Sequence, residues 1–238
     1  ITFSEAVVGL TTADFTVANA ALSNLTTSDN ITWTATLTPG ANVTDATNLI
    51  TLDNFGYTDT VGNPGDAPIN SNNYAIDTQR PMTLSVLVAD TTLKAGQSTT
   101  VTITFSEAVT GLDVSDFTVV DGVLSGLSTA DGGLTWTATL TPVTGKVHSG
   151  LQVALNNAGY TDLAGNAGAN ISFSASYAIN TVLPAQPVLQ VQSNAEGSAT
   201  VRVDALEAGA PWEYSLDGGQ SWQAGQGNLV AISSPGLY

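Results

Sequence analysis

Apolar and polar residues alternate along most of this chain, and threonine fills many of the polar positions. In residues 100–105, Val101, Ile103 and Phe105 alternate with three threonines, which is the period of a strand with one buried and one hydrated face. Similar runs occur at residues 84–88, 136–140, 151–155 and 173–179, and residues 116–120 and 123–127 are expected to form short central strands. The runs 84–88 and 173–179 are each expected to form one half-buried strand. No stretch combines helical periodicity with capping residues.

The chain also repeats itself after about 103 residues, which is the length of a folded module rather than of a short solenoid unit. The matching segments are Thr2–Val7 with Thr104–Val109, Asp14–Val17 with Asp116–Val119, Trp33–Pro39 with Trp136–Pro142, and Gly56–Asp59 with Gly159–Asp162. Seven short strands per complete copy, separated by Gly, Asn and Asp turns, predict an all-β protein of tandem immunoglobulin-like β-sandwich domains.

Two proline-containing linkers, Asp77–Pro81 and Asn180–Pro184, divide the chain into regions 1–79, 80–184 and 185–238. Proline restricts the backbone, so we expect neighbouring modules to be held semi-rigidly. The first copy has only Ile1 ahead of Thr2, where the second copy has residues 83–103, so we expect the first copy to lack its opening strand. The third region differs in sequence, with strands expected near 188–192, 200–204 and 212–214 and no obvious closing strand.

The charge of the chain limits its partners. Lys and Arg number 4 against 20 Asp and Glu, for a formal net charge of -16 and a pI of about 4.1. Such a field repels nucleic acid and anionic membranes and favours cations. Without cysteine, disulfides and thiolate metal sites play no part. No apolar run approaches the length of a membrane span, so no membrane insertion is expected in this segment.

Acidic side chains of the second copy are expected to meet at one pole. If the seven strands alternate in direction, the loop after the second strand, the loop before the last strand and the incoming linker share that pole. They carry Asp77, Glu107, Asp113, Asp116, Asp162 and Asn166. Ca²⁺ takes six to eight oxygen ligands in a tolerant geometry, so this set predicts a structural calcium site at the module junction.

The first copy carries a poorer version of the same set. The equivalent residues are Glu5, Asp14, Asp59 and Asn63, while Thr11 stands in place of Asp113 and no linker carboxylate precedes them. The alternative interpretation is that Asp and Asn occupy these loops because turns require them. Glu107 and its twin Glu5 favour calcium, because a Glu at a strand end has no role in a turn.

These residues resemble a known family, the bacterial Ig-like repeats of very large, calcium-rigidified cell-surface adhesins of the type I secreted, RTX type. The resemblance covers about residues 1–184 and rests on Ile103–Leu112 followed by Asp116-Phe117, on Trp136–Pro142 and on Tyr160–Asn166. It implies secretion to the bacterial surface, a stalk or spacer role in cell adhesion and biofilm, and calcium at domain junctions. The implied partners are neighbouring modules, with any host or surface ligand bound by other domains. Asn180 departs from Asp77 at the second linker.

Catalysis has little support in the sequence, and we expect no enzyme. No pair of carboxylates lies beside a recurring aromatic platform. The only histidine, His148, is expected in a turn, and Asp45 stands at its twin position, which argues against a catalytic triad or a histidine metal site.

Carbohydrate-binding accessory modules of a secreted enzyme are the alternative function. Trp33 and Trp136 fall on apolar strand faces and are expected in the cores, whereas Trp212, Tyr214 and Trp222 are open candidates for sugar contact. The segment Ser215–Trp222 is similar to the Asp-box of sialidase-type propeller repeats, where the Asp bonds turn amides and the Trp packs beneath. Its role there is structural, and a single copy predicts a hairpin, not a propeller.

Overall fold

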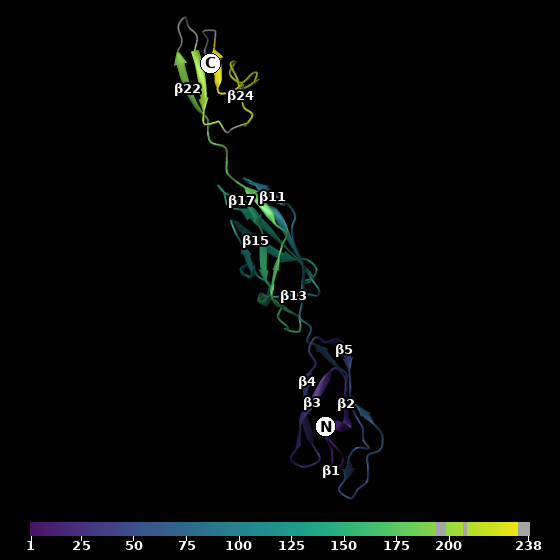
Figure 1. The fold of residues 1–238 in the computed structure, drawn as a ribbon. Helices are drawn as coiled ribbons and strands as arrows, with labels where there is room; N and C mark the ends of the chain where they lie inside the picture. Colours follow the sequence, from purple (N-terminus) through teal and green to yellow (C-terminus); the bar gives the residue numbers. More distant parts are fainter. Residues whose placement is uncertain (194–198, 207–208, 233–238) are drawn as a thin grey trace.

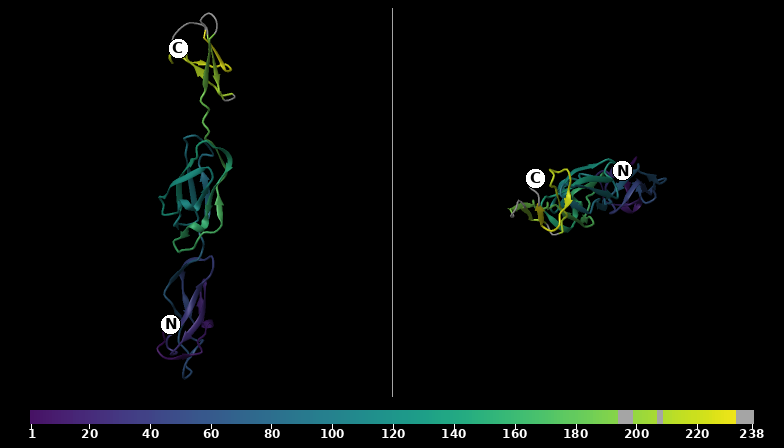
Figure 2. Two further views of the ribbon diagram at one scale, coloured as in Figure 1. Left: turned by 90° about the vertical axis from the view of Figure 1, so that its left-hand side faces the viewer. Right: turned by 90° about the horizontal axis from the view of Figure 1, so that it is seen from above.

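A computed structural model describes residues 1–193, 199–206 and 209–232. Three β modules lie end to end in an elongated row (Figure 1). Figure 2 shows the same row from a second side and from above. The first two modules are the two copies of the repeat, and the third is the region of different sequence.

The second module is a two-layered sandwich. One layer is an antiparallel sheet in the order β10 (Thr83–Val88), β12 (Thr99–Phe105), β16 (Thr135–Pro142) and β15 (Gly122–Thr129). The facing layer contains two ladders, β11 (Thr92–Lys94) with β21 (Tyr177–Asn180) and β17 (Val147–Leu151), and β14 (Phe117–Val119) with β18 (Val153–Asn156) and β20 (Ile171–Phe173). Short strands β13 (Val109–Thr110) and β19 (Thr161–Asp162) pair at the pole next to the first module. The predicted all-β sandwich fold is thereby confirmed.

Alternating side chains fill the space between the layers. Val101, Ile103 and Phe105 of β12 are buried, as are Val153 and Leu155 of β18, and all belong to one continuous core. Trp136 packs against this core, and Trp33 packs against the smaller core of the first module, as the strand pattern predicts. Threonines on the other face of β12 pair across the sheet with threonines of β16, where both remain partly hydrated.

Three local predictions for this module were wrong. Leu84 is 63% exposed, because a register shift between Thr83 and Ser85 turns it away from the core. Residues 173–179 form two strands, β20 and β21, since buried Ser174 accepts a hydrogen bond from the backbone of Val153 between them, and Phe173 is left 58% exposed. His148 lies within β17 instead of a turn.

The first module repeats this arrangement with fewer described strands in both layers. Its strands are β1 (Val7–Val8), β2 (Phe15–Val17), β3 (Ala20–Thr27), β4 (Trp33–Pro39), β5 (Thr44–Asn48), β6 (Ile50–Leu52), β7 (Thr58–Asp59), β8 (Ile69–Asn70) and β9 (Tyr74–Asp77). The sheet of β3 and β4 has two strands where the second module has four. Thr2 forms an isolated bridge with Thr32, at the position where Thr104 of β12 pairs with Thr135 of β16 in the second module.

The third module contains a three-stranded antiparallel sheet and a hairpin. The sheet runs β22 (Val188–Ser193), β23 (Ala199–Asp204), β26 (Leu229–Ile232), and the hairpin pairs β24 (Glu213–Tyr214) with β25 (Gln223–Ala224). Strand β26 was not expected. Asp217 accepts hydrogen bonds from the backbone and hydroxyl of Ser221, as the Asp-box resemblance implies. The expected packing of Trp222 was wrong: it is 62% exposed, and Trp212 instead lies against Gly225, where a Cβ atom would collide with the indole.

Leu140→Ala should destabilise the second module by about 3 kcal/mol, because Leu140 is fully buried and its truncation leaves a cavity. Leu84→Ala is the matched control on the same sheet, and it should change the free energy of unfolding by no more than about 0.5 kcal/mol, since Leu84 faces solvent. Urea unfolding followed through the NMR signals of residues 83–180 measures both. Equal effects of the two substitutions would contradict the described register.

Candidate metal centre at the first junction

A threonine fastens the first linker to the first module. The backbone N–H of Thr78 donates to the carbonyl of Val43 at 2.8 Å, and its hydroxyl donates to the carbonyl of Gly40 at 2.6 Å. The same hydroxyl accepts from the backbone N–H of Val43 at 3.1 Å. The chain therefore leaves the first module in a fixed direction.

Thr181 makes the same set of contacts at the second linker. Its backbone N–H donates to the carbonyl of Lys146, and its hydroxyl donates to the carbonyl of Val143. The same hydroxyl accepts from the backbone N–H of Lys146. The side chain is buried. We call this arrangement the threonine clamp. The sequence signal was a threonine at the same position of both linkers, and its role was missed.

The first linker is also fastened to the second module. Pro81 is buried, and the Met82 backbone exchanges hydrogen bonds with Ser106 of the second module. Asn166 donates from its side chain to the carbonyl of Asp77 at 3.1 Å, which joins the two modules directly. A cavity of about 520 Å³ remains at this junction between residues 39–42 of the first module and residues 165–167 of the second.

Three carboxylates meet at this junction. One oxygen atom from each of Asp77, Glu107 and Asp162 lies within 4.8 Å of the others. Asp77 ends the last strand of the first module, Glu107 follows β12, and Asp162 ends β19. Within the described part of the chain, none of the three forms an ion pair with Lys, Arg or His. The group is therefore a concentration of negative charge without a basic partner among those residues.

The environment of each carboxylate sets its protonation. Asp162 is 2% exposed, and Asn166 donates to it from both the backbone and the side chain at 2.8 Å. Burial raises the pKa of Asp162, but these hydrogen bonds and those from backbone amides of the same turn outweigh it, so the net pKa is lowered. Burial, followed by the charges of Asp162 and Asp77, raises the pKa of Glu107.

Two of the predicted ligands lie in a local cap instead. The Asp113 side chain accepts from the N–H of Ser115, and Asp116 accepts from the N–H of Asp113, which forms a capping box around the 3₁₀ turn Val114–Asp116. Hydrogen bonds from Ser115 lower the pKa of Asp113. The Asp116 carboxylate also lies so close to Gly159 that a Cβ atom there would collide with it. Neither residue belongs to the three-carboxylate group.

The first module has the same Asn–Asp hydrogen bonds and the same acidic cap as the second module, but not the three-carboxylate group. Asn63 donates to Asp59 from its backbone at 2.9 Å and from its side chain at 2.7 Å, as Asn166 does to Asp162. Asp14 accepts from Thr11 in an equivalent cap. Among the described residues, only Asp77, Glu107 and Asp162 form a three-carboxylate group, so Glu5 is not in one.

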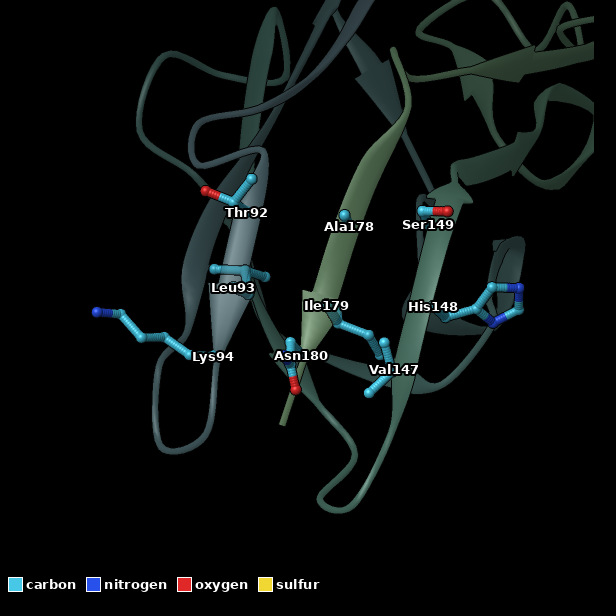
Figure 3. Close-up of a pocket in the computed structure, with 9 residues that line it drawn as sticks. All are labelled: Thr92, Leu93, Lys94, Val147, His148, Ser149, Ala178, Ile179 and Asn180. Atoms are coloured by element: carbon cyan, nitrogen blue, oxygen red, sulfur yellow. The ribbon is translucent and has the colours of Figure 1, made fainter. Parts of the chain in front are cut away.

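The opposite pole of the second module has a different chemistry. A shallow cavity of about 650 Å³ lies on the sheet of β11, β21 and β17, and Figure 3 shows the His148 ring turned away from the neighbouring labelled side chains. The His148 Nδ1 atom lies 3.0 Å from a carboxylate oxygen of Asp121, which also pairs with Lys146 at 3.4 Å. His148 is thus part of a surface charge cluster remote from the junction.

Comparison with known families gives the context of this geometry. The family described as bacterial Ig-like domain matches residues 1–76 and again residues 77–179. The chain belongs to this family. No curated protein matches it. The match to the second bacterial Ig-like domain begins at Asp77, although Asp77 pairs with Thr44 in the first, so this residue is structurally shared by both domains.

Thr78→Val should loosen the first linker, because valine has the same shape but cannot satisfy the N–H of Val43 or the carbonyl of Gly40. We expect a loss of about 1 to 2 kcal/mol in the opening free energy of the Val43 amide, measured by hydrogen exchange. Thr78→Ser keeps the hydroxyl and is the control that should retain protection. Unchanged exchange in the valine variant would show that the threonine clamp does not hold the linker.

Proposed function

We propose that this chain is a structural spacer of a bacterial extracellular adhesin, stiffened by Ca²⁺ at its first domain junction. Bacterial Ig-like domains are typically extracellular or surface modules and are generally non-catalytic. The observation that carries the proposal is the meeting of Asp77 from one domain with Glu107 and Asp162 of the next. In this view the protein's work is mechanical: it holds other domains of the adhesin away from the cell.

The donor set fits a hard cation. Asp77, Glu107 and Asp162 supply carboxylate oxygens, and the side chain of Asn166 uses its nitrogen on Asp77 and Asp162, so its oxygen is also available to a metal. These residues would hold Ca²⁺, with water completing the six to eight ligands that it prefers. The bound ion would supply positive charge that offsets the negative charges of Asp162 and Asp77, which after burial raise the pKa of Glu107.

Calcium at this place would act on the angle between two domains. The carboxylate of Asp77 lies on one domain and the other two on the next, so an ion that binds all three favours the arrangement in which they are close. A ligand that binds one arrangement preferentially stabilises it by mass action. The threonine clamp already restricts the linker, and the ion would restrict the bending that is still possible between the two domains.

The second junction has the threonine clamp, but among the described residues it has no group of three carboxylates like that of the first. Asn180 stands where Asp77 stands, and Val182 and Leu183 are exposed between the clamp and β22. We therefore propose that calcium stiffens the first junction and leaves the second unchanged. The partners in this proposal are the neighbouring Ig-like modules, and a host or surface ligand would be bound by other domains.

The proposal places the chain outside the cell, secreted or on the bacterial surface. Within the described residues, no helix is long and apolar enough to cross a membrane. The glycan-binding alternative gains no support from Trp33 and Trp136, because they pack against the two domain cores, and Trp222, which is 62% exposed, stays a candidate for sugar contact.

Calcium should raise the melting temperature of residues 1–238 by several degrees and narrow the distribution of shapes seen in X-ray scattering, relative to the same chain in chelator. Asp77→Asn should remove most of this response. Asp113→Asn removes the same charge from the nearby cap and is the matched control that should keep it. A chain whose melting temperature and dimensions ignore calcium would rule out the proposal.

Glu107→Gln should change the melting temperature in opposite directions with and without calcium. Because the folded-state pKa of Glu107 is raised, its stabilising contribution is present below its ordinary pKa of 4.5 and is lost as pH rises through the folded-state value. Glutamine imitates the protonated form, so the variant should melt higher than the wild type at pH 7 in chelator, with the difference vanishing near about pH 4. In calcium the wild type should melt higher. Identical melting curves in chelator at pH 7 would contradict the described burial and charge environment of Glu107.

A further inference from the structure

Four Asn-x-Ser/Thr triplets in the chain share an uncommon backbone conformation. They begin at Asn24, Asn30, Asn42 and Asn170, and all four asparagines are exposed with a left-handed φ between 52° and 68°. Such triplets on an exposed surface are the acceptor sequence of N-linked glycosylation. The two side chains that define an acceptor are the asparagine amide and the hydroxyl two residues later, so their surroundings separate the four triplets.

Two triplets have a hydroxyl that already works inside the fold. At Asn170, the hydroxyl of Ser172 is half-buried and accepts from the side chain of Asn157 at 3.0 Å. At Asn42, the hydroxyl of Thr44 donates to the carboxylate at the end of β9 at 2.9 Å. An enzyme would have to break these hydrogen bonds before it could use either hydroxyl.

A third triplet lies within the sheet of β3 and β4. The amide of Asn24 donates to the hydroxyl of Thr36 at 3.4 Å, and the hydroxyl of Thr26 lies 3.4 Å from that of Thr34. Both groups of this triplet therefore have neighbours on the next strand.

The triplet at Asn30 differs because both of its groups are free. It lies in the loop between β3 and β4 (Figure 1), and Asn30, Ile31 and Thr32 are all exposed. Within the described part of the chain, neither the Asn30 side chain nor the Thr32 hydroxyl has a hydrogen-bond partner. In the second module the equivalent loop is exposed at residues 128–132 and at Leu134, although another module precedes it.

The backbone of this triplet is held in place while its side chains are free. The N–H of Asn30 donates to the hydroxyl of Thr27 at 2.9 Å. The carbonyl of Asn30 accepts from the N–H of Val7 at 2.9 Å and from the indole of Trp33 at 3.3 Å. The next two N–H groups donate to Asp29 at 3.0 and 2.8 Å. A fixed backbone lowers the ordering cost when another protein binds the loop.

The second copy of the repeat shows that this backbone does not require asparagine. Gly133 stands at the equivalent position with φ +107°, and its carbonyl also accepts from a valine N–H and a tryptophan indole, those of Val109 and Trp136. Glycine adopts a left-handed backbone at lower cost than asparagine. Asn19, which is left-handed but begins no triplet, instead donates from its side chain to two residues of β5. The Asn30 side chain has no such structural role.

We propose that Asn30 is an acceptor site for N-linked glycosylation. The donor is a sugar activated at its anomeric carbon by a diphosphate, which is carried on a nucleotide or on a polyprenyl lipid. A bond forms between Nδ2 of Asn30 and the anomeric carbon, the bond from that carbon to the phosphate oxygen breaks, and the diphosphate leaves with the electron pair. The amide proton passes to a base of the transferase. The Thr32 hydroxyl is the second group that the transferase recognises.

The test uses the folded chain of residues 1–238 in two separate reactions. One contains a soluble asparagine glucosyltransferase with UDP-glucose, and the other an oligosaccharyltransferase with a polyprenyl-diphosphate oligosaccharide. Mass spectrometry of peptides measures the rate at each asparagine, and the added mass identifies the donor. In at least one reaction Asn30 should be modified about tenfold or more faster than Asn170, where a hydrogen bond must first be broken. No modification of Asn30 in either reaction, or equal rates at the two sites, would overturn the proposal.

Variants of the triplet separate recognition from folding. Thr32→Val should abolish the modification of Asn30, and Thr32→Ser, the matched control, should retain it. Asn30→Gly should remove the site without lowering the melting temperature, because glycine fits the left-handed backbone. Unchanged modification in the valine variant would contradict the role of the hydroxyl and overturn the proposal. None of these results depends on calcium, so the test is separate from that of the proposed spacer function.

Discussion

The architecture of the second module depends on one strand, β12, being hydrogen-bonded on both of its edges. It joins β10 to β16, and its alternate side chains Val101, Ile103 and Phe105 occupy the centre of the core. Satisfying the backbone and covering the core are thus achieved by the same strand.

The first junction is held by polar contacts instead of a shared core. The threonine clamp fixes the departure of the chain, and buried Pro81 fixes its arrival, with only Gln79 and Arg80 between them. Arg80 also donates to the carbonyl of Ala167 at 3.4 Å. The repulsion among Asp77, Glu107 and Asp162 opposes these contacts. The junction therefore combines a geometry that is already restricted with a charge group sensitive to cations and to pH.

Sequence reasoning predicted the strands well because strands with one buried face leave a period of two, as at Val101 and Val153. It failed where the backbone departs from that period and no residue type in the sequence signals the departure. A bulge turns Leu84 outward, and at Ser174 the chain leaves one sheet pairing for another, so one expected strand becomes two. The expected pole of acidic residues followed from strand direction, and the structure brings together Asp77, Glu107 and Asp162. Asp113 and Asp116 could have been separated from them in advance, because an acidic residue three positions after an N-cap is the signature of a capping box.

The parallel pairing of β11 with β21 has a mechanical consequence. β11 lies early in the second module and β21 is its last strand, so tension applied to the two linkers pulls these neighbours in opposite directions along their length. The ladder from Thr92 and Ala178 to Lys94 and Asn180 is then loaded in shear, with its hydrogen bonds sharing the force instead of opening one after another. A module built in this way resists extension through the bonds that join its beginning to its end.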